Sequence, residues 1–247
     1  MLADARTALA FLTRLPVADD RVLDGRGMSR AAAWFPVVGL LVGAVVGGTR
    51  LLGDLVLPAG PSTVLALLAG ILLTGALHED GLADIADGIG AHVPRERKLE
   101  ILRDSRVGTY GAIAAVLPLL FAYTCLVGLG GDDVLAAAIC AHTLARWSIL
   151  PHSRLAGPAR ADGSGALLRV GSPVLVLSTA FTGAVVFVAA GDPVDGAVLL
   201  GLATVMTLAA GLAFARALGG LTGDSYGAVS KLVELAAYGT VAALWIG

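Results

Sequence analysis

Long apolar runs alternate with shorter polar segments along most of this chain. Seven runs predict helices that cross a membrane, at residues 34–53, 62–77, 110–130, 134–150, 173–190, 194–215 and 232–246. A helix needs about 20 mainly apolar residues to cross about 30 Å of hydrocarbon. Because several runs are shorter, those at 62–77 and 232–246 also allow a tilted or partly re-entrant helix, and six or eight crossings stay open.

The segment before the first run has a different pattern. Residues 2–15 have the spacing of an amphipathic helix, and a polar segment continues to Arg30. This start lacks the order of charged, apolar and small residues that marks a cleaved signal peptide. We therefore predict an all-α fold, in which residues 1–247 form a single domain: a polytopic membrane bundle of about seven transmembrane helices with an N-terminal amphipathic helix.

The composition agrees with a membrane protein. Of the 247 residues, 57% are hydrophobic and 15% are charged, and the mean hydropathy is +0.84. Soluble domains contain about 45–50% apolar and about 25% charged residues. The two cysteines, Cys125 and Cys140, lie in apolar runs, which argues against a disulfide framework or a zinc site. No basic stripe interleaved with aromatic residues is present, so nucleic acid is not an expected partner.

The basic residues predict how the chain lies in the membrane. With seven crossings, all of the 17 lysines and arginines except Arg50 fall before the first crossing or in and beside the connections at 78–109, 151–172 and 216–231. Lysine and arginine accumulate on the cytoplasmic side of membrane proteins. We therefore expect a multi-pass protein of the cell (inner or plasma) membrane, with the N-terminus and the polar active-site loops in the cytoplasm.

The connection at 78–109 begins with an acidic stretch, residues 78–88. On a helix, Asp80, Asp84 and Asp87 lie at i, i+4 and i+7 and share one face. Stacked carboxylates repel one another, so this arrangement indicates a bound cation; the alternative is a solvated acidic face in which Asp80 caps the helix. Glu79 projects about 100° away from Asp80 and is not an expected ligand.

Two further polar segments precede apolar runs. The first, residues 103–111, contains Asp104 and follows a short surface helix that Pro94 favours at 94–104. The second, residues 219–228, is a glycine-rich loop around Asp224 that loosely repeats the first. Both aspartates also have a purely structural interpretation. Asp224 could be an ordinary turn residue, and Asp104 could only fix its loop by pairing with a neighbouring arginine.

Carboxylates, arginines and glycine loops together are the parts of a phosphate site. Mg²⁺ takes one or two carboxylates, several waters and substrate phosphates, and positive groups neutralise a transferring phosphoryl group. The chain has no phosphate-binding P-loop. These residues predict a membrane transferase that acts on a pyrophosphate-linked substrate. A secondary transporter is the alternative from another class, although its site should lie near the middle of the membrane.

The motifs together resemble the cobalamin synthase family over essentially the full length. They are, in chain order, Phe11-Leu12-Thr13-Arg14-Leu15-Pro16, Trp34-Phe35-Pro36-x-x-Gly39, His78-x-Asp80-Gly81-Leu82-Ala83-Asp84-x-x-Asp87-Gly88, Arg103-Asp104-Ser105-Arg106-x-Gly108-x-Tyr110-Gly111 and Thr222-Gly223-Asp224-x-x-Gly227-Ala228. Glu79 and Ile85 depart from the family pattern. A CDP-alcohol phosphotransferase is the nearer rival, but its motif needs an arginine where this chain has Asp84.

The resemblance implies an enzyme that uses Mg²⁺ to join adenosylcobinamide-GDP to α-ribazole, or to its 5′-phosphate, with release of GMP. Surrounding lipid is implied as well, and monomer and homo-oligomer both stay open. For Arg146 the alternative role is to extend toward the membrane interface. The residues expected to act are Asp80, Asp84, Asp87 and Asp224 as metal ligands, His78 or Asp104 as general base, and Arg103, Ser105, Arg106, Tyr110, Arg146 and Arg216 as substrate-binding residues.

Overall fold

The computed structural model describes residues 2–17, 25–160 and 168–246, which contain helices and no β-strand. The fold is all-α, as predicted, and helices form at the expected N-terminal segment and at the expected surface helix. Arg21, one of the basic residues before the first crossing, lies outside the described residues. The helices are α1 (Leu2–Leu12), α2 (Gly25–Ala32), α3 (Phe35–Gly53), α4 (Ala59–Thr74), α5 (Leu77–Gly90), α6 (Arg95–Ile101), α7 (Thr109–Val127), α8 (Gly131–His152), α10 (Ser172–Ala190), α11 (Pro193–Leu218) and α12 (Gly223–Trp245).

Six helices in the described ranges are long and apolar enough to cross a membrane: α3, α7, α8, α10, α11 and α12. A seventh crossing results if α4 and α5, which meet at a bend of 86°, are counted as one. The bend has a local cause, because Gly75 and Ala76 both adopt left-handed backbone conformations, with φ of 66° and 58°. Such residues end a helix. The apolar run at 62–77 thus becomes the short α4, and the acidic α5 starts in a new direction.

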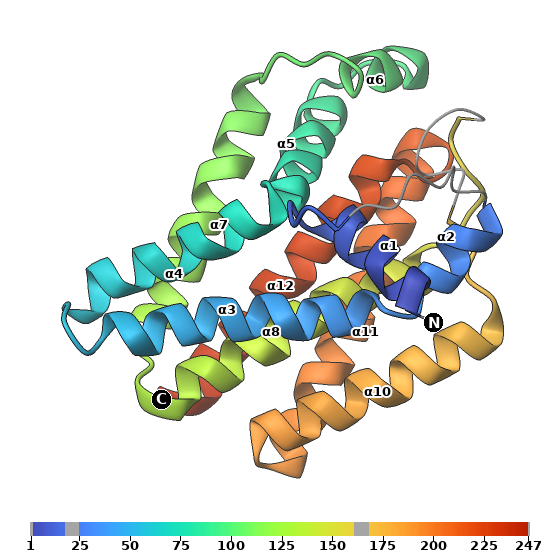
Figure 1. The fold of residues 1–247 in the computed structure, drawn as a ribbon. Helices are drawn as coiled ribbons and strands as arrows, with labels where there is room; N and C mark the ends of the chain where they lie inside the picture. The colour runs from blue at the N-terminus through green and yellow to red at the C-terminus, as the bar shows by residue number, and fades with distance from the viewer. Residues whose placement is uncertain (1, 18–24, 161–167, 247) are drawn as a thin grey trace.

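The two ends of the bundle carry different connections (Figure 1). The α3–α4, α7–α8 and α10–α11 turns and the C-terminus lie toward the lower left, whereas α1, α2, α6 and the α11–α12 turn lie toward the upper right. The connections rich in lysine and arginine therefore share one end of the molecule. Since the N- and C-termini lie at opposite ends, the arrangement agrees with an odd number of crossings, in which α4 and α5 together make one.

Glycines bring α3 onto α8, the most deeply buried of the long helices. A Cβ atom added to Gly43 would lie 2.5 Å from the carbonyl oxygen of Ala138, and one added to Gly39 would collide with the backbone of His142. Small residues permit such close approach where lipid provides no hydrophobic drive between helices. The small-residue pattern of the first apolar run therefore marks the contact between α3 and α8.

The segment at 219–228 differs from the predicted loop. The Thr222 hydroxyl accepts a hydrogen bond of 3.2 Å from the Ser225 N–H, and the Ser225 hydroxyl accepts one of 3.1 Å from the Thr222 N–H. This reciprocal pair is a capping box, which starts a helix. Asp224 therefore lies in the first turn of α12 rather than in a loop, where the helix dipole favours a carboxylate.

Candidate active site

The acidic helix α5 crosses α12 at two glycines. A Cβ atom added to Gly81 would lie 2.9 Å from the backbone oxygen of Asp224 and 3.2 Å from the Cα of Gly227. Only glycine permits backbones to approach this closely. The contact places the acidic face of α5 beside the first turn of α12, so that Asp80 and Asp224, which are distant in the sequence, line one pocket.

Three of the expected metal ligands form an acidic cluster, which we define as Asp80, Asp84 and Asp224. In the described part of the chain, Asp80 and Asp84 have no ion-pair partner. Asp84 is partly buried, and the carboxylates of Asp80, Asp224 and Asp87 bring further negative charge close to it. Arg160 offsets part of this negative charge at Asp224, and a bound cation would offset the rest.

The acidic cluster does not enclose an ion by itself. Among the described residues, no three histidine, cysteine or carboxylate side chains are grouped closely enough to hold a metal ion. The ligands that the chain offers here are carboxylate oxygens, the type that hard cations prefer. The arrangement fits a cation that takes its remaining ligands from water and from a bound substrate.

Asp87 shares the acidic face but has a different set of partners. Its two carboxylate oxygens accept hydrogen bonds of 2.7 Å from the Gly108 N–H and 2.8 Å from the Gly111 N–H. Added Cβ atoms at Gly108 and Gly111 would strike this carboxylate, which explains why both positions are glycine. Asp87 thus holds the first turn of α7, whose free N–H groups need such acceptors.

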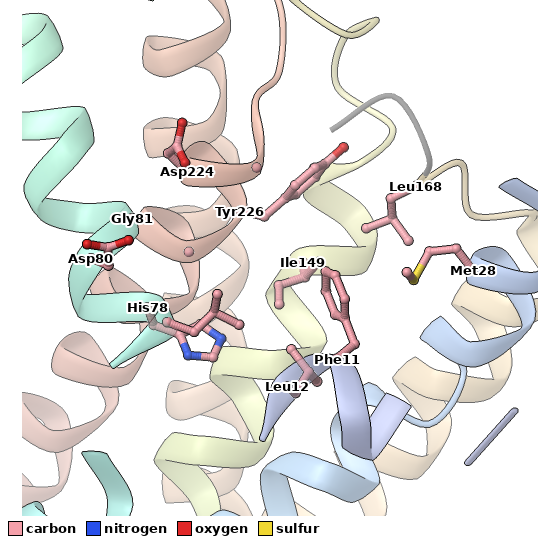
Figure 2. A pocket seen from close by; sticks show the side chains of 13 residues that line it. Phe11, Leu12, Met28, His78, Asp80, Gly81, Ile149, Leu168, Asp224 and Tyr226 are labelled. Atoms are coloured by element: carbon pink, nitrogen blue, oxygen red, sulfur yellow. The ribbon is translucent and has the colours of Figure 1, made fainter. Parts of the chain in front are cut away.

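A pocket of about 160 Å³ lies beside the acidic cluster, between α1, α2, α5, α8 and α12. Figure 2 shows Asp80 and Asp224 on one side of it, with the imidazole of His78 below Asp80. Phe11, Ile149 and other apolar side chains line the opposite side. The pocket can therefore hold a ligand that carries a cation, or a phosphate bound to a cation, at one end and an apolar group at the other. The apolar wall was not predicted from the sequence, because its residues come from four separate segments.

The expected residues of the 103–111 segment lie away from this pocket. Asp104 and Arg106 pair with each other, at 2.6 Å between Oδ2 and Nη2. The hydrogen bonds from Arg106 lower the pKa of Asp104 to about 2, which makes its carboxylate a weak base. The loop-fixing alternative for Asp104 is therefore what the geometry shows. Other expected residues that do not line the pocket are Asp84, Asp87, Arg103, Ser105, Tyr110, Arg146 and Arg216.

Arg146 is buried inside the bundle and does not reach a membrane interface. Its side chain is 2% exposed, and its Nη1 lies 3.1 Å from Glu234 Oε2. Glu79, expected to face away from the site, also points inward, where it accepts a hydrogen bond of 2.8 Å from Lys231. Lys231, Glu234 and His142 were not predicted to act. The available signal was the presence of charged residues on a helix inside the membrane, where they are expensive and often functional.

The fold and the pocket together define a polytopic membrane enzyme with a carboxylate-lined site beside an apolar wall. The chain belongs to the cobalamin-5-phosphate synthase family, whose family model matches residues 4–242.

Several relatives support this assignment. Proteins called adenosylcobinamide-GDP ribazoletransferase are 41% identical in Mesorhizobium japonicum, 36% in Shewanella amazonensis and 38% in Bradyrhizobium diazoefficiens. The matches cover 96%, 96% and 100% of this chain and 91%, 94% and 96% of the relatives. No solved structure shows a significant match.

Proposed function

We propose that this chain transfers the adenosylcobinamide-phosphate group of adenosylcobinamide-GDP to α-ribazole, or to α-ribazole 5′-phosphate, with release of GMP. The names of relatives that match nearly the whole chain support this reaction. The observation that carries the proposal is the acidic cluster, because unpaired carboxylates beside a pocket suit a cation that binds a pyrophosphate. A CDP-alcohol phosphotransferase and a transporter are the competing outcomes of the test below.

Asp80, Asp84 and Asp224 are the residues that would hold Mg²⁺. Because no described trio encloses an ion, water and substrate phosphates would fill the remaining positions, as is usual for Mg²⁺. When bound, Mg²⁺ would neutralise negative charge on the pyrophosphate and on the leaving GMP. Asp87, which we expected among the ligands, is assigned to the start of α7 instead, since both of its oxygens accept hydrogen bonds there.

The reaction is a displacement at phosphorus. A ribose hydroxyl of the ribazole, the 3′-hydroxyl in the family reaction, forms a P–O bond at the phosphorus next to cobinamide. The bond from this phosphorus to the bridging oxygen breaks, GMP leaves with the electron pair, and the hydroxyl proton is released. Such transfers pass through a loose transition state, in which positioning and electrostatics matter more than a strong base. Asp80 and Asp224 would hold the cation to which the pyrophosphate binds, and the apolar wall with Phe11 and Ile149 would exclude water.

Purified protein in detergent or nanodiscs tests the activity. We expect GMP and a corrinoid product, separated by chromatography, only when adenosylcobinamide-GDP, α-ribazole and Mg²⁺ are all present. Asp84→Asn should lower the rate by about 100-fold or more. Asp132→Asn, a change at an exposed carboxylate in the first turn of α8, should leave the rate unchanged.

Three results would contradict these assignments. CMP release from a CDP-alcohol would favour the rival transferase, and corrinoid uptake into vesicles without turnover would favour a transporter. Full GMP release by a correctly inserted Asp84→Asn variant would remove the metal assignment while leaving the reaction itself in place.

We also assign the end of the bundle with α1 and α6 to the cytoplasmic face of the cell inner membrane, because its connections hold nearly all of the basic residues. Single cysteines introduced at Glu96 in α6 and at Leu55 after α3 test this assignment, since both positions are exposed. An impermeant maleimide added to intact cells should label position 55 and not position 96. The reverse pattern would overturn the orientation.

A further inference from the structure

Seven polar side chains from α5, α8 and α12 meet inside the bundle. Charged groups are costly there unless they are paired. We refer to this set as the buried polar network. Its members are His78, Glu79, His142, Arg146, Lys231, Glu234 and Tyr238.

The charges of the buried polar network balance. Lys231 Nζ lies 2.8 Å from Glu79 Oε1 and 2.6 Å from Glu234 Oε1. The second oxygen of Glu234 accepts a hydrogen bond of 3.1 Å from Arg146 Nη1. Two cations thus face two carboxylates, and the side chains of Lys231, Arg146 and Glu234 are each no more than 3% exposed. Such pairing fixes the guanidinium of Arg146 in one position.

Arg146 in turn faces His78. The Nη2 atom of Arg146 lies 3.5 Å from Nδ1 of His78. A guanidinium has only N–H donors, so the imidazole nitrogen that faces it must be the acceptor. The proton of a neutral His78 then lies on Nε2. The tautomer of a histidine is set in this way by the partner of its other nitrogen.

The Nε2 atom of His78 is a buried polar atom in a residue that lines the substrate pocket. His78 is 2% exposed, and its Nε2 has no hydrogen-bond partner in the described part of the chain. The residue lines the pocket together with Asp80 and Asp224, and Figure 2 shows its ring directly beneath Asp80. An unsatisfied buried N–H is unfavourable and is satisfied when a ligand brings an acceptor oxygen.

We propose that the buried polar network presents His78 as a fixed Nε2–H donor to a phosphate oxygen of the substrate, so that His78 does not act as the general base. His78 is then a catalytic residue that binds the transferring group. Arg146 is a positioning residue that acts through His78, rather than a phosphate ligand. The inference rests on the proposed function, since it takes the phosphate from that reaction.

Amide isosteres of His78 test the donor role. The amide nitrogen of a glutamine lies near the position of Nε2, whereas that of an asparagine lies near Nδ1. His78→Gln keeps a donor toward the pocket but cannot act as a base at neutral pH. We expect it to retain kcat within about tenfold of the unmodified protein, while His78→Asn and His78→Ala lose roughly 10²–10³-fold. The KM for α-ribazole should change little in all three variants, and the thermal unfolding midpoint should fall most for His78→Ala, which leaves a cavity at this buried position.

A double-mutant cycle tests the positioning role of Arg146. Arg146→Lys keeps the charge opposite Glu234 but shortens the reach to His78. We expect a loss of kcat of about tenfold or more in the unmodified background. In the His78→Gln background the loss should be much smaller, because an amide has no alternative tautomer. A purely structural role of Arg146 predicts equal losses in both backgrounds.

The outcomes separate the inference from the proposed function. If His78→Gln is as inactive as His78→Ala while the unmodified protein releases GMP, the donor role is wrong and the reaction stands. Equal activities of His78→Gln and His78→Asn would also overturn the donor role. If the unmodified protein releases no GMP under any condition, the proposed function fails. If Arg146→Lys does not fold, the comparison of the His78 variants still tests whether His78 acts as a donor.

Discussion

Asp87 holds the first turn of α7 through Gly108, with 2.7 Å between the Asp87 Oδ2 atom and the Gly108 nitrogen. The bond joins the end of the acidic helix to the start of a helix long and apolar enough to cross a membrane. The position of the acidic cluster is therefore coupled to the packing of the bundle, and substitutions at this contact should affect stability and activity together.

Replacement of Asp87 should destabilise the protein. Asp87→Ala removes the acceptor for the Gly108 and Gly111 N–H groups, so we expect the free energy of unfolding to fall by about 1–3 kcal/mol. Denaturant unfolding in micelles, followed by circular dichroism, measures the change. Asp132→Ala removes an exposed carboxylate from the first turn of α8 and should stay within about 0.5 kcal/mol. Equal effects of the two changes would contradict the capping role.

Gly81→Ala should separate α5 from α12. The new methyl group would lie 2.9 Å from the backbone oxygen of Asp224, so one helix must shift and Asp224 must move relative to Asp80. We expect GMP release to fall by about tenfold or more, given the sensitivity of catalysis to misplacement. Gly183→Ala is the matched control, because no atom lies within 4 Å of the position of its added Cβ. A Gly81→Ala protein with full activity would show that this crossing does not position the site.

Two ion pairs with the same spacing along a helix should contribute very different amounts to the free energy of unfolding. Lys231–Glu234 and Arg97–Glu100 are both i,i+3 pairs, at 2.6 and 2.7 Å, but the first is 3% exposed and the second more than 60%. Lys231→Met leaves two buried carboxylates without that cation and should lower the free energy of unfolding by about 3–5 kcal/mol. Arg97→Met should lower it by about 1 kcal/mol or less. Thermal unfolding in detergent distinguishes these outcomes.

The sequence pattern predicted the helices well where a single physical requirement, such as burial in lipid, applies to neighbouring residues. Apolar runs correspond to the long helices because burial in lipid requires such a run for each crossing. The i, i+4, i+7 spacing predicted that Asp80, Asp84 and Asp87 share a helix, and α5 contains all three. The prediction of a loop around Asp224 was wrong for a local reason. The capping box of Thr222 and Ser225 starts α12 earlier in the chain than the hydrophobic pattern alone indicates.

The roles within the acidic face could not be read from spacing. Asp84 and Asp87 share one face on a helical wheel, yet Asp84 lies near Asp224 and Asp87 holds the start of α7. The difference arises because α5 contacts α12 along one part of its length and α7 along another. Arg146 likewise belongs to the buried polar network because Glu234 and His78 come from other helices.

The sequence by itself determined an all-α membrane protein, the location of its basic connections at one end of the bundle and an acidic helix, because hydrophobicity, charge and helical periodicity act over neighbouring residues. Only the tertiary structure decided which carboxylates line the pocket, and which nitrogen of His78 faces Arg146. Those outcomes depend on contacts between helices that are far apart in the chain, and the two glycines at the α5–α12 crossing permit the closest of them.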